Sequence, residues 1–258
     1  MNGEVSRPEE RSAIILLIII SIVRPFVPGS FVWGLVIVQL VLLVRAIPRH
    51  DWNTVHLGIL LCSLTLFSVL PGTRRWPWIF LMPVLLYWAL VQSFRPLRLT
   101  TAWLRVGHPT LPMWIAAATV AVGSAVSLLL WFKLARPDVT WQAGLIPTWS
   151  PGRLVLLGLG FALFNAAVEE MIWRGVVFHA LERTGLPTFQ VVLMQAVSFG
   201  VVHLHGFPSG SLGILLASAY GAILGVLRWQ TRGLLVPFVA HAVTDLSIFE
   251  ILIYLAHD

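Results

Sequence analysis

Three short groups of ionisable side chains interrupt apolar stretches in the second half of the chain. They are Glu169-Glu170-x-x-x-Arg174, Phe199-x-x-x-His203 and His241-x-x-x-Asp245, where x stands for any residue. A charged side chain at the centre of a membrane helix costs about 2.5 to 3.5 kcal/mol on insertion scales, so residues of this kind are functional candidates. A carboxylate and an imidazole held in one cavity can activate a water molecule. The three groups therefore indicate a functional site built from three helices.

Helical spacing suggests how the first group is arranged. Glu170 and Arg174 are four residues apart with the acid first, so they share a helix face and can form an ion pair. Glu169 is rotated by about 100° from its neighbour and faces elsewhere. Asn165 lies one turn before Glu169 and can hydrogen-bond it. We therefore expect Glu170 to have a structural role and Glu169 to be available for chemistry.

The composition indicates a membrane protein. Of the 258 residues, 58% are hydrophobic and only 11% are charged, whereas soluble globular chains have about 45–50% apolar and about 25% charged residues. This composition excludes a soluble enzyme and a disordered chain. The isoelectric point is near 10.7, but the basic residues are scattered and form no cluster that would bind phosphates, so no nucleic-acid partner is expected. The expected surroundings are a lipid bilayer.

Apolar segments along the chain predict an all-α fold, a polytopic transmembrane helical bundle of about eight or nine spans. The candidate spans are Ser12–Val23, Phe31–Val44, His56–Leu70, Trp76–Phe94, Pro112–Phe132, Leu154–Val168, Phe189–His203, Leu212–Leu227 and Leu234–Leu255. More of the arginines fall on the side of the N-terminus, which favours a cytoplasmic N-terminus. We expect a multi-pass protein of a prokaryotic plasma membrane. The tryptophans near span ends, including Trp76, Trp103 and Trp131, are expected to anchor the helices at the interface with water.

The ordered motifs Glu-Glu-x-x-x-Arg, Phe-x-x-x-His and His-x-x-x-Asn/Asp in apolar helices resemble those of the CPBP family. That family comprises CAAX-processing and bacteriocin-processing intramembrane endopeptidases, also called Abi proteins, and is related to the Ras-converting CAAX endopeptidase. The resemblance covers about residues 150–250. It implies N-terminal transmembrane helices and an interfacial segment over residues 1–150, then a protease core over residues 151–258. The catalytic site would lie in a cavity of this C-terminal four-helix core.

The resemblance also implies a role for each motif residue. Glu169 would be the general base, with His203 as its partner in activating the attacking water. His241 and Asp245 would stabilise the oxyanion at the scissile carbonyl. The mechanism needs no covalent acyl-enzyme and no cofactor, and Glu170 and Arg174 would form the ion pair that supports the site. The partner would be a peptide or a membrane-bound protein substrate; the sequence does not indicate the oligomeric state.

Asp245 leaves three alternatives, because an ionised aspartate accepts hydrogen bonds but does not donate them to an oxyanion. It is protonated in its apolar site, or it fixes the tautomer of His241, or it joins Glu169, His203 and His241 as a ligand of zinc. Three other functions also remain. They are a zinc-dependent version of the protease, a membrane immunity or peptide-binding protein of the same fold that does not cut, and a proton-coupled transporter.

Overall fold

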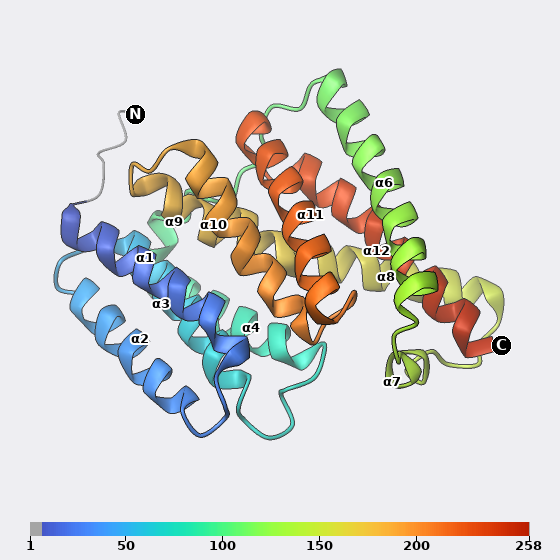
Figure 1. Ribbon diagram of the computed structural model, residues 1–258. Helices are drawn as coiled ribbons and strands as arrows, with labels where there is room; N and C mark the ends of the chain where they lie inside the picture. The colour runs from blue at the N-terminus through green and yellow to red at the C-terminus, as the bar shows by residue number, and fades with distance from the viewer. Residues whose placement is uncertain (1–6, 258) are drawn as a thin grey trace.

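A computed structural model describes residues 7–257, and all regular structure in this range is helical (Figure 1). The first half contains α1 (Pro8–Val23), α2 (Val32–Ala46), α3 (Trp52–Phe67), α4 (Trp78–Ser93), the short α5 (Arg95–Leu99), α6 (Leu111–Ala135) and the short α7 (Thr140–Ala143). The second half contains α8 (Pro151–Glu170), a π-helix (Met171–Val177), α9 (Phe178–Arg183), α10 (Thr188–Val201), α11 (Gly210–Thr231) and α12 (Leu235–His257). Short 3-10 turns follow α1 and α10, over Arg24–Phe26 and Val202–Leu204.

Each of the nine predicted segments forms a helix, but their lengths divide them into two classes. Four helices are long and apolar enough to cross a membrane: Leu111–Ala135, the continuous run Pro151–Arg183, Gly210–Thr231 and Leu235–Tyr254. The others are shorter; α3, for example, has 16 residues and is about 24 Å long at 1.5 Å per residue, whereas the hydrocarbon core is about 30 Å thick. The eight or nine crossings predicted from the sequence are therefore not confirmed.

The outward faces of the long helices are apolar. Leu134 on α6, Leu156 on α8 and Leu215 on α11 have exposed side chains. In the 18-residue apolar stretch of α6, only 22% is buried inside the protein. A large exposed apolar surface on long helices fits contact with lipid rather than water. The chain is an integral membrane protein.

One hydrophobic core joins the two halves of the chain. Leu57 and Leu60 of α3 are fully buried together with Ile172 of the π-helix and Phe178 of α9. Figure 1 shows α1 and α3 beside α9, with α1 also beside α10, while α11 packs along the other side of α10 together with α6 and α12. The helix α8 runs between these groups, and its last two residues, Glu169 and Glu170, begin the first motif.

A backbone contact fixes the start of α12. The chain after α5 pairs with the turn between α11 and α12: the Leu234 N–H donates to the Arg105 carbonyl at 2.8 Å, and the His108 N–H donates to the Thr231 carbonyl at 2.8 Å. A Cβ atom on Gly233 would collide with the backbone of Gly107. The close approach therefore requires glycine, and it sets where α12 begins and how its motif enters the core.

The prediction that tryptophans serve as interfacial anchors is wrong for several of them. Trp103 and Trp131 are buried, with only 1% and 5% of their surface exposed. Trp103 donates its indole N–H to the hydroxyl of Tyr87 at 3.0 Å, so its polar atom has a partner inside the protein. Trp76 lies in the cavity described below. By contrast, Trp33 has an exposed side chain, as expected at an interface.

Candidate active site

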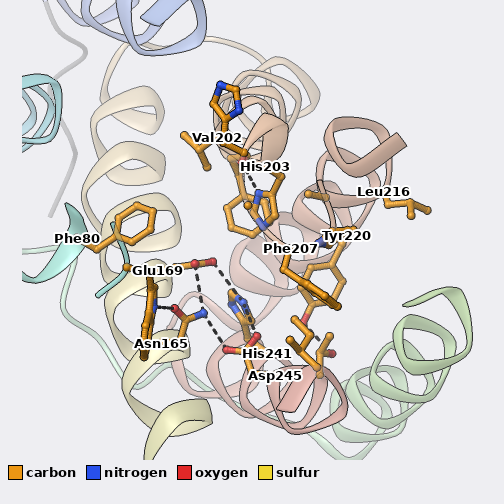
Figure 2. A pocket seen from close by; sticks show the side chains of 18 of the residues that line it. Phe80, Asn165, Glu169, Val202, His203, Phe207, Leu216, Tyr220, His241 and Asp245 are labelled. Atoms are coloured by element: carbon orange, nitrogen blue, oxygen red, sulfur yellow. Dashed lines mark hydrogen bonds and ion pairs between the residues drawn. The ribbon is translucent and has the colours of Figure 1, made fainter. Parts of the chain in front are cut away.

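A cavity of about 1040 Å³ lies between the two halves of the chain. Its walls come from α1, α3, α4, α6, α7, α8, the π-helix, α10, α11 and α12, so both halves of the sequence contribute. Glu169, His203, His241 and Asp245, the four predicted catalytic residues, all line it, and Figure 2 shows them from three separate helical segments. The structure therefore brings the three motifs to one cavity.

Four side chains in this cavity form a closed ring of polar contacts (Figure 2). The amide nitrogen of Asn165 is 3.3 Å from Oε1 of Glu169 and 3.1 Å from Oδ2 of Asp245. The remaining oxygens of the same two carboxyl groups, Oε2 and Oδ1, lie 3.5 Å and 3.7 Å from Nε2 of His241. All these carboxyl groups are buried. The hydrogen bond from Asn165 to Glu169 was predicted from spacing; the bridge to Asp245 was not.

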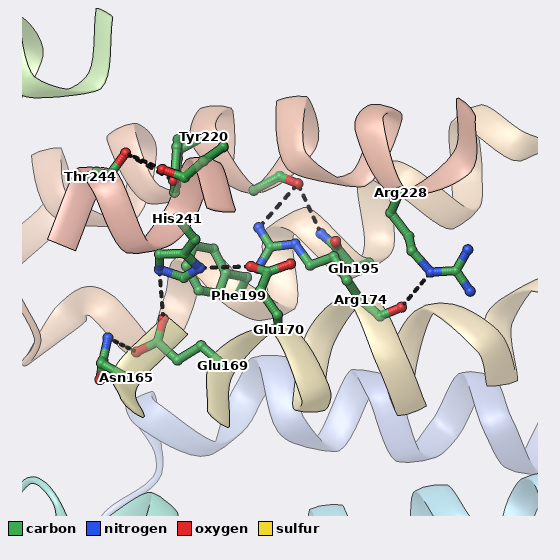
Figure 3. Close-up of polar contacts among 12 residues, drawn as sticks. Asn165, Glu169, Glu170, Arg174, Gln195, Phe199, Tyr220, Arg228, His241 and Thr244 are labelled. Atoms are coloured by element: carbon green, nitrogen blue, oxygen red, sulfur yellow. Dashed lines mark hydrogen bonds and ion pairs between the residues drawn. The ribbon is translucent and has the colours of Figure 1, made fainter. Parts of the chain in front are cut away.

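Glu170 is not among the residues that line the cavity. One of its oxygens contacts both the guanidinium of Arg174 and the imidazole of His241 (Figure 3). Its Oε1 is 3.0 Å from Nη1 of Arg174 and 2.7 Å from Nδ1 of His241. The ion pair predicted from the four-residue spacing is present, and its side chains are almost completely buried. A carboxylate only accepts, so Nδ1 of His241 is the donor in this contact. Glu170 therefore fixes which face His241 presents to the cavity.

Phe199 separates the two motif histidines. Its ring meets His203 edge-on at 4.8 Å and His241 at 6.0 Å between centroids. The guanidinium of Arg174 lies 4.4 Å from the centre of the same ring, which is a cation–π contact. Phe199 of the second motif thus packs against Arg174 of the first motif and His241 of the third.

His203 and Glu169 both face the cavity, but in the described part of the chain no hydrogen bond or ion pair joins them. His203 lies in the 3-10 turn that follows α10, and its Nδ1 is 3.1 Å from the Phe199 carbonyl oxygen. A carbonyl only accepts, so Nδ1 carries the proton and Nε2 of the neutral ring keeps its lone pair. The predicted joint activation of a water by these two residues stays a prediction.

A second polar network holds the π-helix in place. Arg228 of α11 donates from Nε to the Arg174 carbonyl at 3.0 Å. Gln195 of α10 and Arg174 both donate to the Gly221 carbonyl, at 3.3 Å and 3.5 Å. π-Helical turns leave backbone carbonyls without their usual helical partners and are frequent at functional sites. The network fixes the residues that directly follow the glutamate pair.

Sequence reasoning missed several residues of this site. Gln195, Tyr220 and Arg228 are polar side chains within apolar helices, so the rule that singled out the three motifs applies to them as well. Tyr220 lines the cavity and donates to Thr244 at 3.1 Å. Trp76 gives no comparable signal, because a tryptophan near a span end is expected at the interface.

Of the histidines outside the motifs, His205 also lines the cavity, whereas His56 and His179 do not. His56 is buried, with Nδ1 2.7 Å from the Tyr87 hydroxyl and Nε2 3.0 Å from Oγ1 of Thr100. Nδ1 of His179 lies 3.9 Å from Oε2 of Glu182, and His179 does not line the cavity. Cys62 is a buried free thiol.

The four candidate zinc ligands do not form a ligand set. Among the described side chains, which run from residue 7 to residue 254, no group of three or more histidine, cysteine, aspartate and glutamate residues is arranged to hold a metal ion. The ring explains this geometry: each carboxyl group of Glu169 and Asp245 has one oxygen turned to Asn165, and His241 has one nitrogen turned to Glu170. We derive no step through a metal.

Comparison with known proteins supports the reading of the motifs. Residues 151–247 match the family described as Type II CAAX prenyl endopeptidase Rce1-like. No curated protein and no solved structure matched the chain. The matched segment contains all three motifs and runs from the start of α8 into α12. Over this segment the chain is similar to the Rce1-like CAAX endopeptidases, and the family resemblance predicted from its motifs is confirmed there.

Proposed function

We propose that the protein is an intramembrane endopeptidase that hydrolyses a peptide bond through a water activated by Glu169 and His203. The match of residues 151–247 to a CAAX endopeptidase family implies protease activity in general. The observation that carries the finer proposal is the gathering of Glu169, His203, His241 and Asp245 on one cavity, from helices far apart in the sequence. The substrate is a peptide or a membrane-associated protein that enters this cavity.

In the proposed reaction, the water oxygen attacks the carbonyl carbon of the scissile bond and its proton passes to Glu169. The lone pair on Nε2 of His203 accepts a hydrogen bond from the same water. The tetrahedral intermediate then collapses, the C–N bond breaks, and Glu169 returns the proton to the leaving amine. No covalent intermediate forms with the protein, so no serine or cysteine nucleophile takes part.

His241 is the proposed donor to the oxyanion, through Nε2–H. Its other nitrogen donates to Glu170, and Asp245 lies 3.7 Å from Nε2. Both oxygens of Asp245 face donors, because the second accepts from Asn165. This arrangement favours the alternative in which Asp245 orients His241 over the one in which a protonated Asp245 itself donates to the oxyanion.

The test is cleavage of a fluorescence-quenched peptide that ends in a prenylated CAAX sequence, by the purified protein in liposomes. We expect Glu169→Gln and His203→Ala to lower kcat at least about 100-fold, because each removes a group that handles the proton of water. Glu250→Gln is the matched control: Glu250 is an exposed carboxylate on α12, outside the cavity, and its loss should leave kcat unchanged.

Other outcomes would favour the alternatives. Full turnover in both Glu169→Gln and His203→Ala would contradict the mechanism. A cellular function that persists in both variants would favour a peptide-binding or immunity protein. Loss of wild-type turnover on treatment with a chelator, restored by zinc, would favour the zinc-dependent version of the protease.

A further inference from the structure

The side-chain amide of Asn165 joins the two carboxylates of the cavity. Glu169 lies on α8 and Asp245 on α12, and the packing of these helices brings two acidic side chains to the same place. Like charges at short range repel, more strongly where water is excluded. The two N–H groups of the Asn165 amide meet one oxygen of each carboxylate, at 3.3 Å and 3.1 Å. The amide thereby bridges two side chains that would otherwise turn apart.

Trp76 fixes the direction of this amide. Its indole N–H donates to Oδ1 of Asn165 at 2.9 Å. An indole nitrogen only donates, so the amide oxygen must face Trp76 and both amide N–H groups must face the carboxylates. The Trp76 ring is itself held edge-on against Phe161 at 5.3 Å, and Phe161 stacks on Phe249 at 5.9 Å. Trp76 lies between α3 and α4, in the half of the chain outside the matched family segment.

We propose that Asn165 is a positioning residue for the reaction and that Trp76 acts through it. The amide occupies Oε1 of Glu169 and Oδ2 of Asp245. Each carboxylate then presents its remaining oxygen to Nε2 of His241, at 3.5 Å and 3.7 Å. This inference rests on the proposed function, because it assigns Glu169 as the base that Asn165 orients. It gives the N-terminal half a part in catalysis through a single hydrogen bond.

The inference separates turnover from binding. The cavity is large and mostly formed by other residues, so removing one amide should leave substrate affinity nearly unchanged. Orientation of the base affects the transition state more than the ground state, and this difference appears in kcat rather than in KM. A side chain with a general packing role would instead lower the amount of folded protein without changing its kinetic constants.

The kinetic test compares three variants on the prenylated CAAX peptide. Asn165→Ala should lower kcat about 10-fold or more with KM within about twofold. Trp76→Phe keeps an aromatic ring and removes only the N–H, and should lower kcat by a smaller factor. In the double variant, kcat should equal that of Asn165→Ala alone, because Trp76 has no amide left to orient.

Trp88→Phe is the matched control. Trp88 is also part-buried in the first half and also donates its indole N–H to the second half, to the sulfur of Met171 at 3.1 Å. It does not line the cavity, so its kinetic constants should be those of the wild type. An unchanged kcat in Asn165→Ala would overturn the proposal, as would full additivity of the Trp76 and Asn165 substitutions.

A second measurement does not depend on turnover. The chain has three asparagines, Asn2, Asn53 and Asn165, so protein labelled with ¹⁵N only in asparagine gives three side-chain amide signals. The Asn165 signal is identified by its absence in Asn165→Ala. Its chemical shift should change in Glu169→Ala, in Asp245→Ala and in Trp76→Phe, and should be unchanged in Trp88→Phe.

The two measurements distinguish failure of this inference from failure of the proposed function. If the wild type does not cleave the peptide, the amide signal still tests whether Asn165 bridges the carboxylates. If the chemical shift of Asn165 is unchanged in both Glu169→Ala and Asp245→Ala, the proposal that Asn165 bridges the two carboxylates is wrong. Wild-type cleavage that depends on Glu169 but not on Asn165 would overturn the positioning role and leave the proposed function in place.

Discussion

Glu170 is the residue whose role changes most when the contacts are known. Spacing assigned it to Arg174 alone, but its Oε1 also accepts from Nδ1 of His241 at 2.7 Å. One buried carboxylate therefore balances a guanidinium and orients an imidazole from another helix. The first motif supports the third through this contact, and the two adjacent glutamates act on the two nitrogens of the same ring.

Glu170→Gln should destabilise the protein. The change leaves the guanidinium of Arg174 buried without its anion, and breaking a buried ion pair from one side costs about 3–5 kcal/mol. We expect a lower midpoint in thermal unfolding of the detergent-solubilised protein, together with loss of cleavage. The double variant Glu170→Gln/Arg174→Met removes the unpaired charge and should recover much of the stability. It should not recover activity, because a neutral amide lacks the negative charge that holds the Nδ1–H of His241; a fully active double variant would contradict the role assigned to Glu170.

At the scale of elements, the second motif, which spans the end of α10 and the following 3-10 turn, depends on how closely that helix approaches α11. Gly200 comes directly after Phe199, and a Cβ atom there would overlap Oγ of Ser218 and lie 2.7 Å from the Ile214 carbonyl oxygen. Because the Ile214 carbonyl belongs to the backbone of α11, it cannot turn aside as a side chain can. The glycine therefore lets the two helices pack at a distance that sets the place of His203.

Gly200→Ala should push α10 away from α11 and lower the free energy of unfolding by about 1–3 kcal/mol, the usual cost of overpacking. Gly160→Ala is the matched control on α8, because nothing lies within 4 Å of the Cβ that it would add. Alanine has the higher helix propensity by about 0.8–1 kcal/mol, so this control should be neutral or stabilising. Unfolding in denaturant checks both variants, and equal stability of the two would contradict the close approach.

The elements also show what could be predicted from the sequence. Hydrophobic segments and four-residue spacing reflect local geometry. The nine helical segments and the ion pair between Glu170 and Arg174 were therefore predictable. Contacts between helices depend on how distant segments pack. The bridge from Asn165 to Asp245 spans 80 residues and the bond from Trp76 to Asn165 spans 89. No local pattern marks such pairs, which is why Trp76 was expected at the membrane surface.

For the whole molecule, the segment that matches the protease family is not a separate core. About half of the buried residues in the main hydrophobic core come from helices before residue 104. Phe178 of α9, for example, is fully buried in a cluster with Leu57 of α3. The cavity has walls from both halves, and Trp76 reaches the ring of polar side chains. A motif segment of this kind needs the preceding helices to bury its apolar surface.

Residues 147–258 expressed alone should therefore fail to form a folded, active protein. Losing the first half exposes the buried faces of the π-helix and α9, and burial of each large apolar side chain contributes about 1.5–3 kcal/mol. Co-expression of residues 1–146 should restore a complex that co-purifies in detergent and cleaves the peptide. The control is the intact chain cut after folding at a protease site inserted in the exposed stretch 148–150, which should stay assembled and active. A C-terminal fragment that is active by itself, with the thermal midpoint of the whole protein, would contradict the shared core and the contribution of Trp76 together.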